Sequence, residues 1–416
     1  LLSSGHLDDG RKVLAESLAD AGITLPAANV RGRIATLWRR GRMAVRGLQW
    51  HERPAAELPR TALVRVDLLR AAAVGALLVD PASAPDIQAQ HLLLSLQTGE
   101  PTRIGRAIAL EAALAVQLGP AGRPRAQAML AEARKLIDRL GDRETAYLVE
   151  LIELIAAAHS GDFAACLARA DALANAPDAD LALPHARQVV HTHGLLALLQ
   201  LGRLPLLAER LPARLSAATE SDDRSTLVTL HGLNLWLCLA RDDLTGAREA
   251  VAASERAWPH PPAHGPHEQH RQLSHARALF HLYTGHPARA LQALQEGPGQ
   301  PATFAARVLS ADLAARVHVA AWRQQPGDAA LRRVATRAVD DLHALGLVSA
   351  AAVLRASLHP ESAEPLLRAA ADEFAARGRA IHHATVLLRL HDPAGAAALR
   401  ALGVADPDRY AGLIAP

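Results

Sequence analysis

The sequence predicts an all-α protein, an α-solenoid built from tetratricopeptide-like helical hairpins. Three observations favour this fold. Half of the 416 residues are apolar and only 3% are aromatic, and Ala and Leu dominate, which is typical of helices. Apolar residues recur at helical spacing, and the helices come in pairs separated by short polar turns. These turns follow one another at nearly constant intervals, as in repeat proteins.

The interval can be counted from one residue in each turn: Asp80, Gly122, Gly161, Gly202, Asp242, Gly285, Gly327, Glu361 and Asp392. Successive marks lie 42, 39, 41, 40, 43, 42, 34 and 31 residues apart. The period of about 40 residues exceeds the roughly 34 residues of a standard tetratricopeptide repeat. The last intervals are short, as expected of terminal repeats that cap a stack. We therefore expect a solenoid over residues 1–296 and a C-terminal continuation with shorter capping repeats over residues 297–416.

The first helices are expected over His6–Ala21 and Val30–Trp50. Gly5 is a stop signal, and Leu1 and Leu2 before it read as the last turn of an earlier helix. This start predicts that the chain begins within a helical pair of a longer protein.

The following helices are predicted from apolar periodicity, with Gly and Pro marking the breaks between them. They are expected over Arg60–Val79, Asp86–Thr98, Ile104–Leu118 and Arg123–Leu140, then in further pairs to Glu296, and over Phe304–Trp322 and Asp328–Leu345. Trp258–His270 contains four Pro and is predicted to be a long loop. The tail after Gly403 is predicted to be short and polar, with Tyr410 folding back.

Composition narrows the class of protein. The net charge of +3 is small for this length, so nothing requires a nucleic-acid partner. Cys166 and Cys238 are too few for a disulfide framework and are predicted to be small buried side chains. No apolar run reaches the ~18 residues of a membrane span, and no signal peptide is visible. A cytoplasmic protein is the default expectation.

The helix expected from Val30 carries six arginines: Arg31, Arg33, Arg39, Arg40, Arg42 and Arg46. Such a helix can bind phosphate, lipid headgroups or an acidic partner. It can equally be a solvated face with snorkelling Arg stems. We favour the solvated face, because charge runs of this kind are usually solvated.

Candidate chemistry is sparse. His267-Glu268-Gln269-His270 has a spacing of three, whereas the zinc motif H-E-x-x-H needs four. The acidic pairs Asp8-Asp9, Asp222-Asp223, Asp242-Asp243 and Asp340-Asp341 are mostly placed to cap helix starts. The only lysines, Lys12 and Lys135, do not follow Gly, which excludes a phosphate-binding P-loop. We predict no catalytic, cofactor-binding or metal-binding residue and no cofactor.

Two segments carry a resemblance to a known family. RGRIATLWRRGRMAVRGLQWHER (Arg31–Arg53) and DIQAQHLLLSLQTGEPTRIGRAIALEAAL (Asp86–Leu114) resemble the C-terminal helical region of large bacterial serine/threonine protein kinases. In that family a kinase domain precedes an AAA-type ATPase domain and a long tetratricopeptide-like region. The resemblance is strongest over Leu1–Leu151. The kinase signatures H-R-D and D-F-G are absent, so no functional residue is carried over.

The resemblance implies a non-catalytic interaction or effector-sensing solenoid of a multidomain kinase–ATPase. Its concave surface would bind a protein, a peptide or a small effector and bias the attached domains. An alternative is the sensor solenoid of an ATPase-type transcriptional regulator. A free-standing helical enzyme is a third class, for which the sequence offers no motif.

Overall fold

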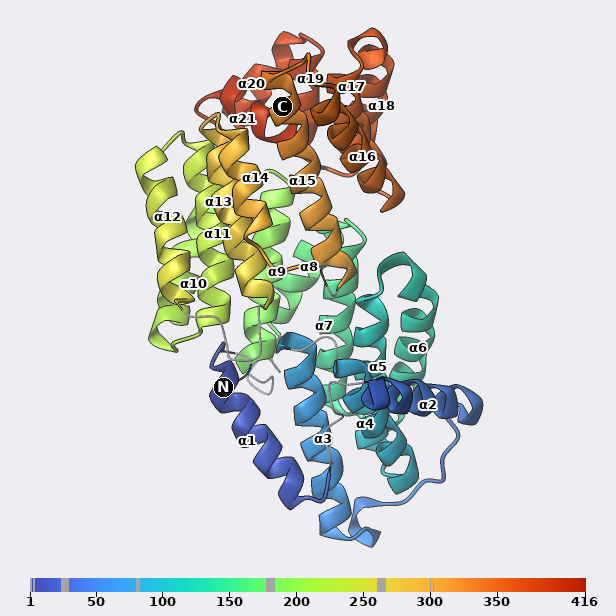
Figure 1. Cartoon of the computed structure of the whole chain (residues 1–416). Helices are drawn as coiled ribbons and strands as arrows, with labels where there is room; N and C mark the ends of the chain where they lie inside the picture. Colours follow the sequence, from blue (N-terminus) through green and yellow to red (C-terminus); the bar gives the residue numbers. More distant parts are fainter. Residues whose placement is uncertain are drawn as a thin grey trace.

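The computed structural model describes residues 2, 4–23, 30–79, 83–176, 184–259, 267–299, 301 and 303–416. Within these residues every regular element is a helix and none is a strand. The all-α prediction is therefore confirmed, and consecutive helices pack in pairs as a helical solenoid requires (Figure 1).

Three helices stand outside the pairs: α1 (Leu7–Asp20), α2 (Val30–Arg46) and α21 (Pro407–Ile414). The hairpins are α3 (Arg60–Val79) with α4 (Ala84–Thr98), α5 (Pro101–Val116) with α6 (Arg123–Leu140), α7 (Arg143–His159) with α8 (Phe163–Ala174), α9 (Pro184–Gln200) with α10 (Leu204–Glu220), α11 (Arg224–Ala240) with α12 (Leu244–Ala257), α13 (Glu268–Tyr283) with α14 (Pro287–Gln295), α15 (Phe304–Gln324) with α16 (Ala329–Ala344), α17 (Val348–Leu358) with α18 (Ala363–Ala376), and α19 (Ala380–Arg389) with α20 (Pro393–Ala401).

The odd-numbered helices form one continuous layer. Each odd-numbered helix from α3 to α15 packs against the next odd-numbered helix, while its even-numbered partner lies on the other side. One hydrophobic cluster runs through this layer from Tyr147 to Ile414. It crosses the boundary expected at residue 297, so the two parts of the stack share a core.

The turns within the hairpins follow a local rule. The first turn residue takes a left-handed conformation, as at Gly161 with φ 76° and Asp242 with φ 55°. The next residue is often an Asp whose side chain accepts a hydrogen bond from a backbone N–H at the start of the second helix, as at Asp162 and Asp243. Such caps satisfy amides that the helix leaves unpaired. The predicted role of the acidic pairs Asp222-Asp223 and Asp242-Asp243 is confirmed.

All the marked turn residues that the structure describes, from Gly122 to Asp392, lie between the two helices of a hairpin. Asp80 lies outside the described residues, as does Leu1. The helix predicted over Arg60–Val79 is found with those bounds.

Several predicted helices have ends shifted by one to three residues, as at Ile104–Leu118, which is found as Pro101–Val116, and three further predictions are wrong. The second helix ends at Arg46 rather than Trp50, because Gly47 turns left-handed with φ 65°. The loop predicted to His270 ends earlier: α13 starts at Glu268, and His270 Nδ1 accepts a hydrogen bond from the His267 amide at 3.0 Å. The tail after Gly403 is not a polar extension, because it forms α21 and is buried.

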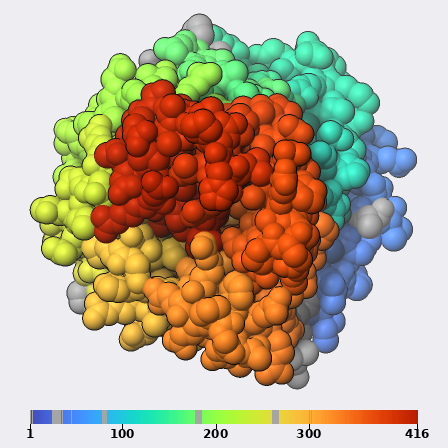
Figure 2. Space-filling view, turned by 90° about the horizontal axis from the view of Figure 1, so that it is seen from above, coloured from blue at the N-terminus to red at the C-terminus, as the bar shows by residue number. Residues whose placement is uncertain are grey.

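Helix α21 fills the inside of the C-terminal half. Tyr410 is 1% exposed, and its ring meets Trp236 of α11 edge-on with centroids 6.2 Å apart. Arg409 pairs with Asp242 at 2.7 Å and lies over the ring of Tyr283 of α13. The predicted folding back of Tyr410 is confirmed. Viewed from above, the C-terminal residues cover the centre of this face (Figure 2).

The backbone at the end of α21 is held by side chains from three more odd-numbered helices. Arg316 of α15 donates to the Leu413 carbonyl, Arg389 of α19 to the Ala415 carbonyl, and Ser357 of α17 to the Pro416 carbonyl. These bonds satisfy carbonyls that a helix end leaves free. Since α21 contacts odd-numbered helices, their layer is the inner one.

The stack buries several histidines on both odd- and even-numbered helices. Burial, with the charge of Arg70 adding to it, lowers the pKa of His91 to about 3. Burial is also the main cause that lowers the pKa of His159 and His275 to about 4. His382 is fully enclosed, and burial followed by the charge of Arg379 holds its pKa well below the usual value. These imidazoles are therefore neutral at pH 7.

Truncating the buried ring of α21 tests its contribution to stability. Tyr410→Ala should lower the free energy of unfolding by roughly 3 kcal/mol or more, because it leaves an aromatic-sized cavity. Urea unfolding followed by circular dichroism measures the change. Tyr410→Phe keeps the ring and should stay near wild type; equal behaviour of both variants and wild type would contradict a packed α21.

The neutral histidines predict a loss of stability in acid. Their folded-state pKa values lie below the unfolded value of 6.5, so between about pH 6.5 and 4 the unfolded chain binds more protons. Stability should therefore fall as the pH falls through this window. Melting temperatures between pH 7.5 and 4.5 check this, and His382→Gln, which keeps an acceptor but does not titrate, should flatten the curve. A melting temperature that is constant from pH 7.5 to 5 would refute the prediction.

Candidate ligand cleft

The larger cavity lies in the outer part of the stack, where α10 and α12 flank α11. It has a volume of about 540 Å³. Its lining includes Leu227, His231 and Asn234 of α11, and Glu249 and Arg256 of α12. Small residues of α12 leave the space between the helices open, because an Ala side chain fills little of a groove that Leu or Phe would occupy.

His231 of α11 is one of the polar residues that line the cleft. Its Nδ1 atom is buried and has no hydrogen-bond partner in the protein. Burial and then the charge of Arg256 lower its pKa, which the charge of Glu249 partly offsets. The neutral ring offers one donor and one acceptor. Because Nδ1 is closed off from solvent, a ligand in the cleft would meet the ring of His231 along its exposed part.

Charged pairs stand at the rim of the cleft. Arg256 and Glu249 form an ion pair on α12, and both side chains are about two-thirds exposed. Asp222 at the other rim lies 3.1 Å from His6 Nε2, and the amide of Arg224 donates to the Ser4 carbonyl at 2.9 Å. The chain before α1 therefore borders the cleft. Together these groups suit a small polar ligand with separate donor and acceptor ends.

A second cavity of about 140 Å³ lies among α9, α11 and α13 beside Leu2. Its lining includes His185, His193 and Thr229. His193 Nδ1 lies 2.8 Å from the Val189 carbonyl, which satisfies that nitrogen. A space of this size holds a few waters, so the larger cleft is the better candidate for a ligand.

The histidines of the segment His267-Glu268-Gln269-His270 and those near it are not brought together as a site. His267 and His270 form the start of α13, and His275 lies beside Ser310 with 3.2 Å between His275 Nε2 and the hydroxyl. Over the parts of the chain that are described, no group of three or more His, Cys, Asp or Glu is placed to hold a metal ion. His260 and His264 lie outside those parts.

The two cysteines are free thiols. Cys166 is fully buried, and burial followed by the charge of Asp162 raises its pKa to about 12. Cys238 is half-buried. The prediction of small buried side chains is confirmed for Cys166 and holds in part for Cys238.

The arginine-rich helix differs from the expected solvated face. Arg39 pairs with Asp86 of α4, and Arg40 pairs with Glu111 of α5. Both carboxylates are almost wholly buried, at 1% and 2% side-chain exposure. Arg31 and Arg33 lie on a turn whose side chains are outside the described residues. Sequence reasoning missed these pairs, although two acidic residues inside apolar helices were a signal that cations would cover them.

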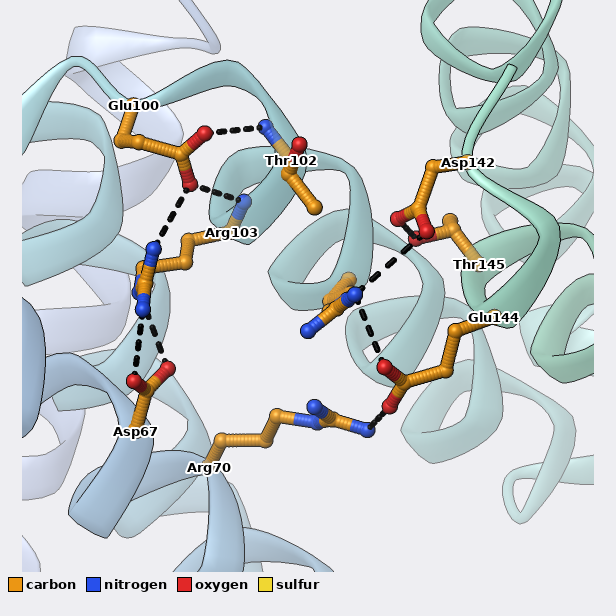
Figure 3. Close-up of polar contacts among 9 residues, drawn as sticks. Asp67, Arg70, Glu100, Thr102, Arg103, Asp142, Glu144 and Thr145 are labelled. Carbon is orange, nitrogen blue, oxygen red and sulfur yellow. Dashed lines mark hydrogen bonds and ion pairs between the residues drawn. The ribbon is translucent and has the colours of Figure 1, made fainter. Parts of the chain in front are cut away.

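A cluster of polar residues on α3, α5 and α7 is structural rather than an open site (Figure 3). Arg103 of α5 donates two hydrogen bonds, of 2.7 and 2.9 Å, to the carboxylate of Asp67 of α3. Arg106, one turn further along α5, contacts Glu144 of α7 at 2.8 Å, and Arg70 of α3 contacts the same carboxylate. Every arginine of this cluster is paired with an acid, so it binds neighbouring inner helices together.

No protein-family model matches this chain, and no curated protein does either. None of the described helices is long and apolar enough to cross a bilayer. The geometry of the cleft is therefore the basis for the function proposed below.

Proposed function

We propose that this chain is a non-catalytic sensor solenoid that binds a small polar effector. The observation that carries the proposal is the cleft of about 540 Å³, whose lining combines alanines with His231, Asn234 and the Glu249–Arg256 ion pair. Ligand sites commonly have volumes of about 300–1,000 Å³, apolar walls and a few convergent polar groups. The cleft has that size and lining.

The effector would act by changing the relation between neighbouring hairpins. The cleft involves three consecutive helices, so a ligand there would touch two neighbouring hairpins, α9 with α10 and α11 with α12. A ligand between α10 and α12 would therefore favour one curvature of the stack over another. An interaction surface for a protein or peptide on the concave side remains part of the proposal, supported by the continuous inner layer of helices.

The parent protein is proposed from the resemblance of Arg31–Arg53 and Asp86–Leu114. We propose a cytoplasmic bacterial serine/threonine kinase with a central AAA-type ATPase domain, with a period of about 40 residues along its solenoid. The alternative parent is an ATPase-type transcriptional regulator. A DNA-binding domain in the full reading frame would favour the regulator.

The cleft can be tested by a thermal-shift screen with free amino acids, nucleotides, sugar phosphates and polyamines. A ligand at about 100 times its Kd should stabilise the fold by about 2.7 kcal/mol. His231→Phe should abolish this shift, because it keeps the ring but removes both nitrogens. His318→Phe, at a half-buried position of α15 away from the cleft, is the matched control and should keep it.

A ligand whose stabilisation survives His231→Phe would place the effector elsewhere. If no compound in these four classes shifts the melting temperature, the small-effector proposal fails and the protein-interaction surface takes its place.

The chain should not bind Mg-ATP with micromolar affinity. The sequence has no G-x-x-x-x-G-K-[ST] loop, and phosphoryl transfer depends on groups that cradle the phosphates and hold magnesium. Calorimetric titration with Mg-ATP, together with a phosphate-release assay, checks this on the purified chain. Saturable binding with turnover that survives repurification would overturn the non-catalytic assignment.

A further inference from the structure

Helix α2 carries an apolar stripe that points to solvent. Ile34 is 61% exposed, Leu37 72%, Trp38 63% and Val45 90%. At 3.6 residues per turn these positions share one face of the helix. Among the described residues, four of the eleven exposed large apolar side chains lie on this helix. The rest are scattered over other elements, as is normal for a protein surface.

The orientation of α2 is fixed by its opposite face. Arg39 and Arg40 on that face reach the buried carboxylates of Asp86 and Glu111, and Met43 between them is 5% exposed. Rotating α2 to bury the apolar stripe would leave the buried carboxylate of Asp86 without its cation and that of Glu111 with Arg125 alone. Breaking a buried ion pair is strongly destabilising, because the remaining charge stays buried and uncompensated. The helix thus shows its apolar side to solvent as a consequence of how it is anchored.

The edge of the stripe is basic. Arg42 lies over the ring of Trp38 at 5.6 Å, and Arg46 follows one turn later. The helix contains six arginines and no acidic residue. Figure 1 shows α2 crossing α4 and α5 at the side of the stack rather than between two hairpins.

We propose that α2 is a peripheral membrane anchor that docks on an anionic lipid surface. Helices that lie in the membrane interface combine an apolar face carrying Trp, Leu or Ile with an Arg-rich polar face. In α2 the stripe of Ile34, Leu37, Trp38 and Val45 would enter the headgroup boundary. Arg42 and Arg46 at its edge would contact lipid phosphates, and Trp38 would sit at the interface, where its ring is favoured.

Charge favours lipid over the other occupants. A second copy packing through a two-fold axis would bring two arginine-rich helices together, and like charges would repel. A nucleic acid would satisfy the arginines but would leave the apolar stripe against a phosphate backbone. An anionic bilayer offers a partner to the stripe and to the arginines at once.

The test is co-sedimentation of the whole chain with large vesicles. One set is pure phosphatidylcholine and the other is a mixture of phosphatidylcholine and phosphatidylglycerol. The protein should bind the anionic vesicles and not the neutral ones, and added salt should weaken binding because it screens the arginines.

Leu37→Ser combined with Trp38→Ser should weaken binding on the order of tenfold or more, because two apolar side chains no longer enter the interface. The matched control is Leu309→Ser combined with Val348→Ser, two residues on α15 and α17 that are 50% and 49% exposed. This control should bind like wild type. Arg42→Gln with Arg46→Gln should reduce the preference for anionic vesicles while leaving Arg39 and Arg40 in place.

Circular dichroism and the melting temperature of each variant verify that the fold is kept, as expected for exposed positions. The proposal is overturned if wild type does not bind anionic vesicles at low salt, or if the Leu37/Trp38 variant binds as well as wild type. It is also overturned if wild type forms a dimer in solution that this variant abolishes, because the stripe would then be an interface between copies. The His231→Phe thermal-shift result is independent of all these outcomes.

Discussion

The guanidinium of Arg379 holds together parts of the stack that are far apart in sequence. It donates to Gln200 Oε1 at 2.7 Å at the end of α9, and lies within 5.8 Å of the ring centroids of Phe163 and Phe374. Burial lowers its pKa to about 10, so it stays charged at neutral pH. Cation–π contacts and two charged hydrogen bonds, to Gln200 and to His382 Nε2 at 2.8 Å, replace part of the water that it has lost.

This contact depends on the backbone beside it. Gly202, in the turn after α9, has φ 75°, and a Cβ there would lie about 3.1 Å from Ile381. Glycine therefore meets two needs at once, a left-handed turn and the close approach of α19. Because α19 can settle on this turn, the last hairpins curl back over α9, and the inner layer encloses α21.

The closure decides where a partner can bind. In the C-terminal half the inner surface is occupied by Tyr410, Leu413 and their neighbours, so in this half the free surfaces are on the outside. The cleft over α11 and the apolar stripe of α2 are both of this kind. A solenoid that is curled this tightly offers less concave surface than the repeat pattern alone suggests. The grooves between outer helices are therefore the more favourable places for a ligand to bind.

The sequence was sufficient for features that depend on near neighbours. A left-handed Gly or Asp followed by a capping Asp needs only a few residues, so turns such as Gly161-Asp162 were located correctly. The inward packing of α21 depends on Trp236 and Tyr283. The orientation of α2, with its apolar stripe toward solvent, depends on Asp86 and Glu111. These partners lie tens to hundreds of residues away, where periodicity carries no information. His231 was not predicted for the same reason, because its cleft exists only between separate helices.

The near absence of lysine has a physical counterpart in this architecture. Arginines occupy buried positions where a lysine would readily lose its charge. Arg316 is 7% exposed and contacts both Asp312 and the Leu413 carbonyl. The planar guanidinium donates to the Asp312 carboxylate and to the carbonyl at the end of α21 in different directions. The ammonium group of a lysine, on its flexible side chain, is less suited to this. The same property lets Arg39 and Arg40 reach into the stack while α2 stays on its surface. Arginine thus joins the C-terminal hairpins to α9, through Arg379, and fixes α2 with its apolar side facing solvent, through Arg39 and Arg40.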